Sequence, residues 1–422
     1  MTLNLPATTL PTAPAPLDSK SFPDQPKSGS TKMPATLDNF VHLTDAHGIS
    51  FRFNMMTKQT EVHVPGLVAS HQNREEVTVI HLESLMVRHG MSPIAVPRFL
   101  LAVADHHRHD PFADWIDSTP WDGISRLPDI CGTITPTEDY PPHFANVLIH
   151  KWLLSIVAAT FHGPGFHSRG VLTLQGGQGL GKTSWFGQLV TPPALREQAI
   201  KLGHGWDGGS KDSRLSAISH RIVELGELEG SFRRELASLK SFVTDRADKI
   251  RAPYARRPAE YPRMTVFGAS VNDDSFLIDA TGNSRFWTIS AAKIDFCHSI
   301  DMQQVFAELK VQFLAGKPWW LSPEEEAKLA EINARHEVSC VVGDRIAAEL
   351  DLSRMGRADL PKMRAIEVLE KIGIERPTNA QLKEANAALR SLLGGSRRIR
   401  GANYWNVPWA PAGTHKLKDN EF

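Results

Sequence analysis

The sequence has few cysteines, no net charge and no long apolar run, and each absence excludes a class of protein. Its three cysteines, Cys131, Cys297 and Cys340, are scattered and odd in number, which argues against a disulfide framework or a zinc site and favours a reducing, cytoplasmic compartment. Lysine and arginine total 47, as do aspartate and glutamate, so any nucleic-acid surface must be local. The longest apolar run, Trp152 to Phe161, covers about half of the residues that span a bilayer. No secretion signal is visible, and we expect no membrane partner.

A glycine-rich octapeptide, Gly176-Gly177-Gln178-Gly179-Leu180-Gly181-Lys182-Thr183, completes the pattern G-x-x-x-x-G-K-[ST]. It follows an apolar run, 171–175, that predicts a buried strand, and it precedes residues 184–190, which can continue as a helix. Glycines let successive N–H groups curl around a phosphate chain, and the helix N-terminus adds partial positive charge. The motif and Ser184 therefore predict an ATP site, with Lys182 on the β- and γ-phosphates and Thr183 holding Mg²⁺. The alternative is a glycine-rich turn without function.

The rest of the chain divides into segments of different composition. Residues 1–37 are rich in proline and poor in large apolar residues, so we expect a disordered tail. Residues 38–150 predict a mainly helical N-terminal domain, with a hairpin at 49–53 and 61–64 and helical spacing over 74–89 and 97–108. Strand-like runs at 171–175, 221–225 and 264–269 alternate with helical segments and predict a P-loop ATPase core of parallel sheet over 151–295. We expect a helical connector over 296–340 containing a helix at 322–336, a winged-helix-like module over 341–410 containing a helix at 363–372, and a tail over 411–422. The fold class is thus α/β.

Acidic and polar residues follow the octapeptide where an ATPase needs them. Carboxylates at Glu224 and Glu227 are suited to the Mg²⁺ shell and to orienting the attacking water. Side chains alternate between the two faces of a strand, so residues 224 and 227 of a continuous strand would point to opposite faces. Both carboxylates therefore face the phosphates only if the chain turns near Gly226. We expect Glu227 to orient the water, and Glu224 either to bind the metal or to support a residue that does; the alternative leaves one of them as an exposed acid at the strand end. Asn272, just beyond the run 264–269, suits a sensor of the γ-phosphate.

Arg285 follows a glycine turn and precedes Phe286 and Trp287, two aromatic residues that can anchor it. An arginine held rigidly at this place can serve as an arginine finger on the ATP of a neighbouring subunit. The alternative is an arginine in an ordinary surface ion pair.

A basic stretch with aromatic residues lies between the carboxylates and Asn272. From Ser231 to Pro262 it holds eight lysines and arginines against four acidic residues. Cations for phosphates and a ring for stacking are what a channel for single-stranded nucleic acid requires, although such a run can also be a solvated face. The candidate DNA contacts are Lys240, Lys249, Arg251, Tyr254, Arg256 and Arg257, to which a C-terminal basic hairpin adds Arg397, Arg398 and Arg400.

The order of these parts resembles the virulence-associated protein E family, which is related to the superfamily 3 helicases of phage and viral primase-helicases. The resemblance covers about residues 105–290 and is carried by Trp121-Asp122-Gly123, the octapeptide, Glu224-Leu225-Gly226-Glu227-Leu228, Asp248…Arg251…Pro253-Tyr254, Asn272 and Gly282-Asn283…Arg285-Phe286-Trp287. It implies an AAA+-like core that forms a homo-oligomeric ring, a hexamer, and uses ATP to move on single-stranded or forked DNA. The setting it implies is replication of a phage, plasmid or genomic island, with a separate primase or initiator as a further partner.

The chain departs from that family in two places. Ser284 stands where many relatives have a first arginine, so Arg285 alone must supply any contact to a neighbouring subunit. No primase site is visible upstream, since the one metal-like cluster, residues 105–110, reads Asp-His-His-Arg-His-Asp and is interpreted as a solvated helix end.

Three other functions fit parts of the sequence. An ATP-controlled replication initiator or regulator would bind DNA through the C-terminal arginines without unwinding it. A GTPase switch would explain Asp279-Ala280-Thr281-Gly282, but no Asn-Lys dipeptide occurs, so the usual guanine-reading motif is missing. A small-molecule kinase is a third, weaker option.

Overall fold

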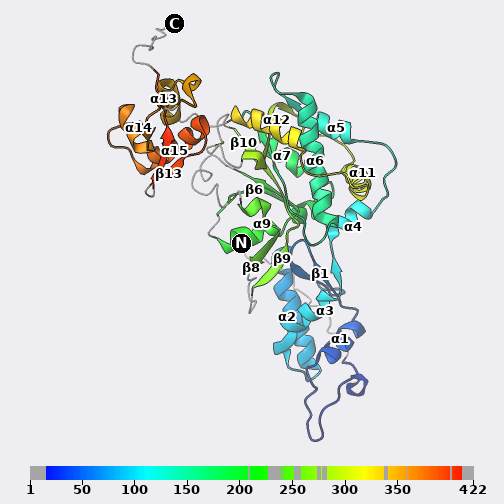
Figure 1. Ribbon diagram of the computed structural model, residues 1–422. Helices are drawn as coiled ribbons and strands as arrows, with labels where there is room; N and C mark the ends of the chain where they lie inside the picture. The colour runs from blue at the N-terminus through cyan, green and yellow to red at the C-terminus, as the bar shows by residue number, and fades with distance from the viewer. Residues whose placement is uncertain are drawn as a thin grey trace, which may run out of the picture.

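The computed structural model describes residues 16–207, 210–226, 239, 241–250, 258–272, 277, 283–336, 341–357, 359–399 and 402–410. The described part is a mixed α/β protein, as the sequence predicts. Figure 1 shows an N-terminal domain, a central sheet with helices around it, and a C-terminal module that lies apart from that sheet.

The N-terminal domain is a small sheet covered by helices. Its three-stranded sheet has the order β2-β1-β3, and the expected hairpin and both expected helices are present. The Thr36 hydroxyl accepts a hydrogen bond from the Asn39 N–H and caps the first helix. The elements are η1 (Ser19–Ser21), α1 (Leu37–Ala46), β1 (Ser50–Asn54), β2 (Gln59–His63), η2 (His71–Asn73), α2 (Arg74–Arg88), η3 (Pro93–Ala95), α3 (Val96–Asp105) and β3 (Arg108–His109).

The segment before α1 packs against this domain, so the prediction of a disordered tail over 1–37 is wrong for part of it. Phe22 and Met33 are buried in the core of the domain. The Asn39 side-chain amide donates to the carbonyl oxygens of Asp24 and Pro34, both at 2.9 Å. Two apolar anchors and these hydrogen bonds order a proline-rich segment that has almost no regular structure of its own. Residues 1–15 lie outside the described residues.

The centre of the molecule is a six-stranded sheet with the order β4-β11-β5-β10-β7-β6. All pairings are parallel except that of β4 with β11. The residues of β5 and β7 are buried on both faces, which explains their continuous apolar runs. The strands are β4 (Ile134–Pro136), β5 (Val171–Gln175), β6 (Ile200–His204), β7 (Ile222–Leu225), β10 (Val266–Val271) and β11 (Phe286–Ile294), and a separate hairpin is formed by β8 (Ala247–Ile250) and β9 (Ala259–Pro262).

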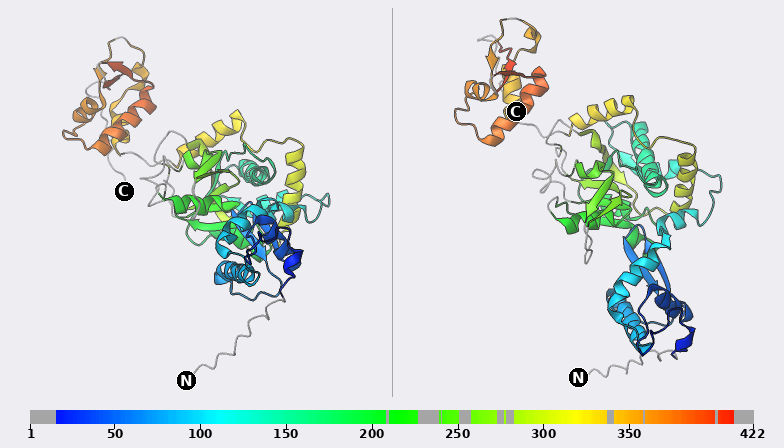
Figure 2. Two further views of the ribbon diagram at one scale, coloured as in Figure 1. Left: turned by 90° about the horizontal axis from the view of Figure 1, so that it is seen from below. Right: turned by 60° about the horizontal axis from the view of Figure 1, so that its bottom comes forward.

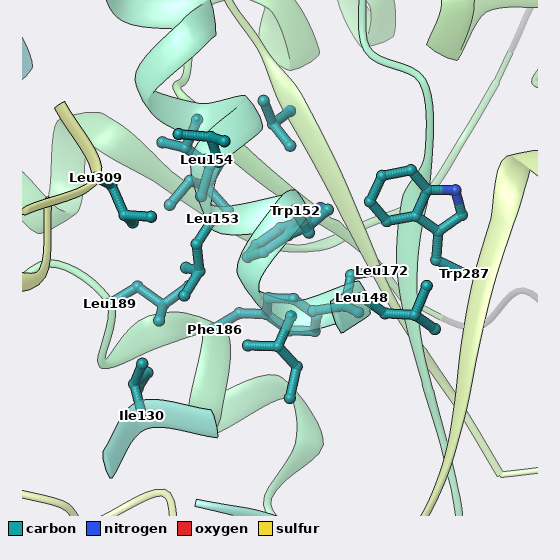
Figure 3. Close-up of a cluster of buried hydrophobic side chains, with 14 of the residues drawn as sticks. Ile130, Leu148, Trp152, Leu153, Leu154, Leu172, Phe186, Leu189, Trp287 and Leu309 are labelled. Atoms are coloured by element: carbon teal, nitrogen blue, oxygen red, sulfur yellow. The ribbon is translucent and has the colours of Figure 1, made fainter. Parts of the chain in front are cut away.

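Helices cover both faces of this sheet. On one face, Leu172 and Leu174 of β5 pack with Trp152 and Phe186, and Figure 3 shows this cluster. The rings of Trp152 and Phe186 meet edge to face, with centroids 5.5 Å apart. On the other face, the core cluster contains Val171 of β5. The helices are α4 (Pro111–Asp117), α5 (Leu127–Gly132), α6 (Pro142–Phe161), α7 (Lys182–Gly187), α8 (Pro193–Ala199), α9 (Lys211–Ile218), α11 (Met302–Leu314) and α12 (Pro323–Ala334), besides η4 (Asn283–Arg285).

The boundary expected at residue 150 is wrong, because the sheet domain begins near Pro111. β4 pairs with β11 and α6 lies in the main core, so both belong to the sheet domain although they precede the boundary. A strand of three residues such as β4 carries too little pattern to be recognised in the sequence. Residues of α11 and α12 also pack into this core and are more than a connector.

One helix among the described residues, α6, is long and apolar enough to cross a membrane by length and composition. Of its most apolar 18-residue window, 67% is buried inside the protein. Core packing therefore accounts for its apolar composition.

The C-terminal module has its own small core around Ile346, Leu389 and Trp405. Its three-stranded sheet has the order β12-β14-β13, and Figure 2 shows the module apart from the central sheet in two further views. The expected helix at 363–372, the capping box at Thr378 and the basic hairpin are present. The elements are α13 (Val341–Glu349), η5 (Leu352–Arg354), β12 (Lys362–Met363), α14 (Ala365–Lys371), α15 (Asn379–Leu393), β13 (Arg397–Ile399) and β14 (Ala402–Asn406).

Candidate functional site

The glycine-rich loop joins the carboxyl end of β5 to the start of α7. Gly179 and Gly181 both have φ of 83°, a left-handed conformation that costs glycine little and other residues more. A Cβ atom on Gly181 would collide with the ring of Phe296, so this position has no room for a side chain. The Gly176 N–H donates to the Val271 carbonyl at 3.1 Å, which ties the start of the loop to β10. The loop is thus held between two neighbouring strands.

The Lys182 ammonium lies at the centre of this loop. It donates to the carbonyl oxygens of Gly176 at 2.6 Å and Gly177 at 2.7 Å, and to Asn272 Oδ1 at 2.9 Å. The side chain is only 6% exposed. An anion placed beside this buried cation would be stabilised.

A second group of oxygen atoms lies beside the start of α7. The Thr183 hydroxyl donates to Glu224 Oε1 at 3.2 Å and lies 3.3 Å from Ser270 Oγ. Glu224 is fully buried in β7, and its Oε2 accepts the Gly203 N–H at 2.6 Å. Carboxylate and hydroxyl oxygens are the ligands that a hard cation such as Mg²⁺ prefers, so these side chains fit a magnesium site. The sequence reasoning missed Ser270 and Gly203, and a polar residue inside an apolar strand is the signal that points to Ser270.

Both groups open into one cavity with a volume of about 410 Å³. Lys182, Thr183, Glu224 and Asn272, which lie far apart in the sequence, all line it. They meet because β5, β7 and β10 are parallel neighbours whose carboxyl ends lie at one edge of the sheet. The full lining consists of Gln178, Gly179, Leu180, Gly181, Lys182, Thr183, Ser184, Gly203, Glu224, Gly226, Ser270 and Asn272.

Arg285 lies at the amino ends of the parallel strands, whereas the cavity lies at their carboxyl ends. It ends η4 directly before β11, and Phe286 pairs with Val171, the first residue of β5. Because the five residues of β5 are separated by rises of about 3.3 Å each, its first and last residues are about 13 Å apart. Arg285 is therefore not brought to the cavity of its own chain. Its Nε is buried and has no hydrogen-bond partner among the described residues.

The candidate DNA contacts are only partly described. Lys249 is exposed on β8, and Arg397 and Arg398 are exposed on β13. The other candidate DNA contacts lie outside the described residues: Lys240, Arg251, Tyr254, Arg256, Arg257 and Arg400. Glu227, the residue expected to orient the attacking water, lies outside them as well.

The histidine-rich segment 105–110 is not simply a solvated helix end, because Asp110 is 5% exposed. Asp110 caps α4 by accepting from the Phe112 and Ala113 N–H groups, and it forms an ion pair with the fully buried Arg221. His109 Nε2 lies 3.0 Å from Glu61 Oε2. The parts of the chain that the structure describes contain no group of three or more His, Cys, Asp or Glu residues suited to a metal.

The fold and the site thus define a mixed α/β protein with a glycine-rich loop, a buried lysine and a buried carboxylate around a cavity. Residues 116–338 match the model of the virulence-associated protein E-like domain. This match covers more than half of the chain, and the chain belongs to that family.

Two comparisons with solved structures concern the C-terminal region of NrS-1. An apo structure of its residues 305–718 shares 15% identity, with 87% of this chain and 98% of that chain covered and a TM-score of 0.40. An A form apo structure of the same region shares 13% identity, with 88% and 99% covered and a TM-score of 0.39. No curated protein sequence matches significantly.

Proposed function

We propose that the chain is an ATP-dependent DNA helicase or translocase of superfamily 3 type that acts in replication of a phage, plasmid or genomic island. The observation that carries the proposal is the cavity, which combines a glycine-rich loop with Lys182, Thr183, Glu224 and Asn272. A mixed sheet with the loop at the carboxyl end of a central strand suits an AAA+-like P-loop core. Membership of the virulence-associated protein E-like family supports the setting in a mobile element.

Each cavity residue has a proposed task on ATP. Loop N–H groups and the Lys182 ammonium bind the β- and γ-phosphates, and Asn272, already hydrogen-bonded to Lys182, senses the γ-phosphate. Thr183 and Glu224 hold Mg²⁺, which neutralises phosphate charge when bound. Glu227 orients the attacking water, as proposed from the sequence. Glu227→Gln should then bind ATP without hydrolysing it, and the reverse result, in which Glu224→Gln alone traps ATP, would exchange the two roles.

The β8–β9 hairpin is the proposed contact with single-stranded DNA. The hairpin is separate from the central sheet, and Lys249 is exposed on β8. Residues 251–257, between the two strands, contain Arg251, Tyr254, Arg256 and Arg257, which supply cations and a ring for a strand of DNA.

Arg285 is the proposed arginine finger in a ring of subunits, a hexamer. Its place at the sheet edge opposite the cavity supports action on the ATP of a neighbouring subunit. A mixture of Arg285→Ala and Lys182→Ala chains tests this, because some interfaces of mixed rings pair an intact loop with an intact Arg285. We expect part of the ATPase activity to return. Mixed oligomers as inactive as the separate variants would contradict a contact between subunits.

A replication initiator that binds DNA without unwinding it is the second candidate. The observation that favours it is the C-terminal module, in which Arg397 and Arg398 are exposed on the β13–β14 hairpin. A strand-displacement assay on forked DNA with Mg²⁺ and ATP separates the two functions. We expect unwinding and DNA-stimulated ATP hydrolysis, whereas binding of duplex DNA without displacement would favour the initiator.

A further inference from the structure

The turn between β1 and β2 contains a lysine in a conformation that usually belongs to glycine. Lys58 has φ of 64° and is the only non-glycine residue among the described parts of the chain with a positive φ. The left-handed conformation costs a residue with a Cβ about 1 kcal/mol. Asn54 Oδ1 accepts the Met56 and Thr57 N–H groups, each at 3.0 Å, which fixes the turn. A side chain at position 58 is thus present where glycine would be the less strained choice.

This turn belongs to the N-terminal domain but is built into the core of the sheet domain. Met56 is 1% exposed and packs in the same core cluster as Phe112 and Phe186. The Asn54 side-chain amide donates to Gln198 Oε1 at 3.2 Å. The position of the turn relative to the central sheet is therefore fixed.

The Lys58 side chain reaches from the turn to the base of the β8–β9 hairpin. Its ammonium donates to the Met55 carbonyl at 2.7 Å and lies 6.0 Å from the ring centroid of Tyr261 in β9. Two buried ion pairs, Arg221 with Asp110 and Arg263 with Asp248, are close enough to act on its charge. Burial first and Arg221 second lower the pKa of Lys58 to about 8, although Asp110 and Asp248 act in the opposite direction.

The hairpin depends on such contacts because it is not hydrogen-bonded into the central sheet. At the base, Asp248 of β8 is paired at 2.7 Å with Arg263, the residue after β9, and this ion pair joins the two strands. The Arg263 guanidinium also lies 4.2 Å from the ring centroid of Phe242, which lies outside the hairpin. The Lys58 contact with Tyr261 lies on the side of the N-terminal domain, and Figure 1 shows β9 beside β1. Side-chain contacts, rather than a strand ladder, therefore set the direction of the hairpin.

We propose that Lys58 is a positioning residue for the β8–β9 hairpin: the β1–β2 turn of the N-terminal domain braces the hairpin base, so that the strands β8 and β9, with the exposed Lys249, are held in place for single-stranded DNA. This inference rests on the proposed DNA contact of the hairpin. It gives the N-terminal domain a task in DNA binding without requiring that domain to contact DNA.

Three substitutions in the full chain separate positioning from folding. Lys58→Gly removes the side chain and suits the left-handed backbone, Lys58→Met keeps an aliphatic stem without the ammonium, and Lys58→Arg keeps a cation. Lys32→Met is the control, since Lys32 is an exposed lysine of the same domain. The readouts are affinity for oligothymidylate by fluorescence anisotropy, the DNA concentration that half-maximally stimulates ATP hydrolysis, ATP hydrolysis without DNA, and the melting temperature.

We expect Lys58→Gly and Lys58→Met to weaken DNA affinity by roughly 10-fold, within the range of coupling between separate sites, and to raise the half-maximal DNA concentration similarly. Hydrolysis without DNA should stay at the parent rate, Lys58→Gly should melt no lower than the parent, and Lys58→Arg should recover most of the affinity. If the parent binds single-stranded DNA and both variants bind it with the same affinity, the positioning inference is wrong and the proposed function stands. A parent that binds no single-stranded DNA overturns both.

Discussion

The strand β7 has a buried charged residue near each end, and the two have different surroundings. Arg221, directly before the strand, is paired with Asp110 and also donates to the carbonyl oxygens of Ala159 and Met264 at 2.9 and 2.8 Å. Glu224, inside the strand, accepts from Thr183 and Gly203 and lines the cavity. A buried charge whose partners belong to the protein fastens segments together, whereas a buried charge beside a cavity is available to a ligand. We therefore propose that the amino end of β7 fastens segments of the protein together and that its carboxyl end belongs to the proposed ATP site.

The largest effect should come from the cavity side. Lys182→Ala removes the cation that offsets charge on the transferred phosphoryl group, and we expect ATP hydrolysis to fall on the order of 100-fold or more. A steady-state ATPase assay measures this, and a thermal melt checks that the variant is folded. Hydrolysis at the parent rate in a folded variant would show that the loop is not the ATP site.

The ion pair at the other end of β7 should affect stability. Asp110→Ala leaves Arg221 buried without its carboxylate, and we expect the free energy of unfolding to fall by about 3–5 kcal/mol. Asp110→Asn is the matched control, because it keeps a side-chain oxygen that can cap α4 but loses the charge. We expect Asp110→Asn to be destabilised as well, but by about 1 kcal/mol less than Asp110→Ala, because a typical cap contributes about that much. Urea unfolding measures both, and a loss below ~1 kcal/mol for Asp110→Ala would mean that Arg221 finds another partner.

These contrasting surroundings could be predicted only in part. The octapeptide is a local pattern, Glu224 lies near the end of one strand-like run and Asn272 follows another, so a parallel sheet was enough to expect both near Lys182. The pairing of Arg221 with Asp110 has no local signal, since 111 positions separate the two residues. Lys58 likewise stands in an ordinary polar turn, and its backbone conformation and contact with Tyr261 appear only in three dimensions. Ordering of Phe22 and Met33 also depends on the tertiary core, which composition does not show.

A smaller effect is expected at the C-terminal module, which is remote from both ends of β7. Replacing Arg397 and Arg398 with alanine should weaken duplex DNA binding and reduce the slope of log affinity against log salt by about 2, since each lost phosphate contact removes ~0.9. Binding measured from low to moderate salt tests this. The control is a second double variant, Arg357→Ala with Arg376→Ala, which removes the same two positive charges at other exposed positions of the module. Equal slopes for the two double variants would exclude a specific role of the hairpin.

The smallest effect concerns the charge of Lys58 at the domain junction. Its pKa is lowered to about 8 from 10.5, chiefly by burial and by Arg221, while Asp110 and Asp248 act in the opposite direction and Arg263 adds a smaller lowering. Between these two values the unfolded chain binds more protons than the folded chain, so the free energy of unfolding rises with pH. Relative to Lys58→Met, the parent should gain stability from pH 8 to 10.5 in urea unfolding. A constant difference over this range would show that Lys58 titrates as it does in water.

The claim that the cavity is an ATP site is tested most directly by isothermal titration of the full chain with a non-hydrolysable ATP analogue and Mg²⁺. We predict one site per chain, competition by inorganic tripolyphosphate, and loss of binding in Lys182→Ala while Asp110→Asn still binds. Absence of binding by the folded parent, or equal affinity of the parent and Lys182→Ala, would contradict the assignment of the cavity.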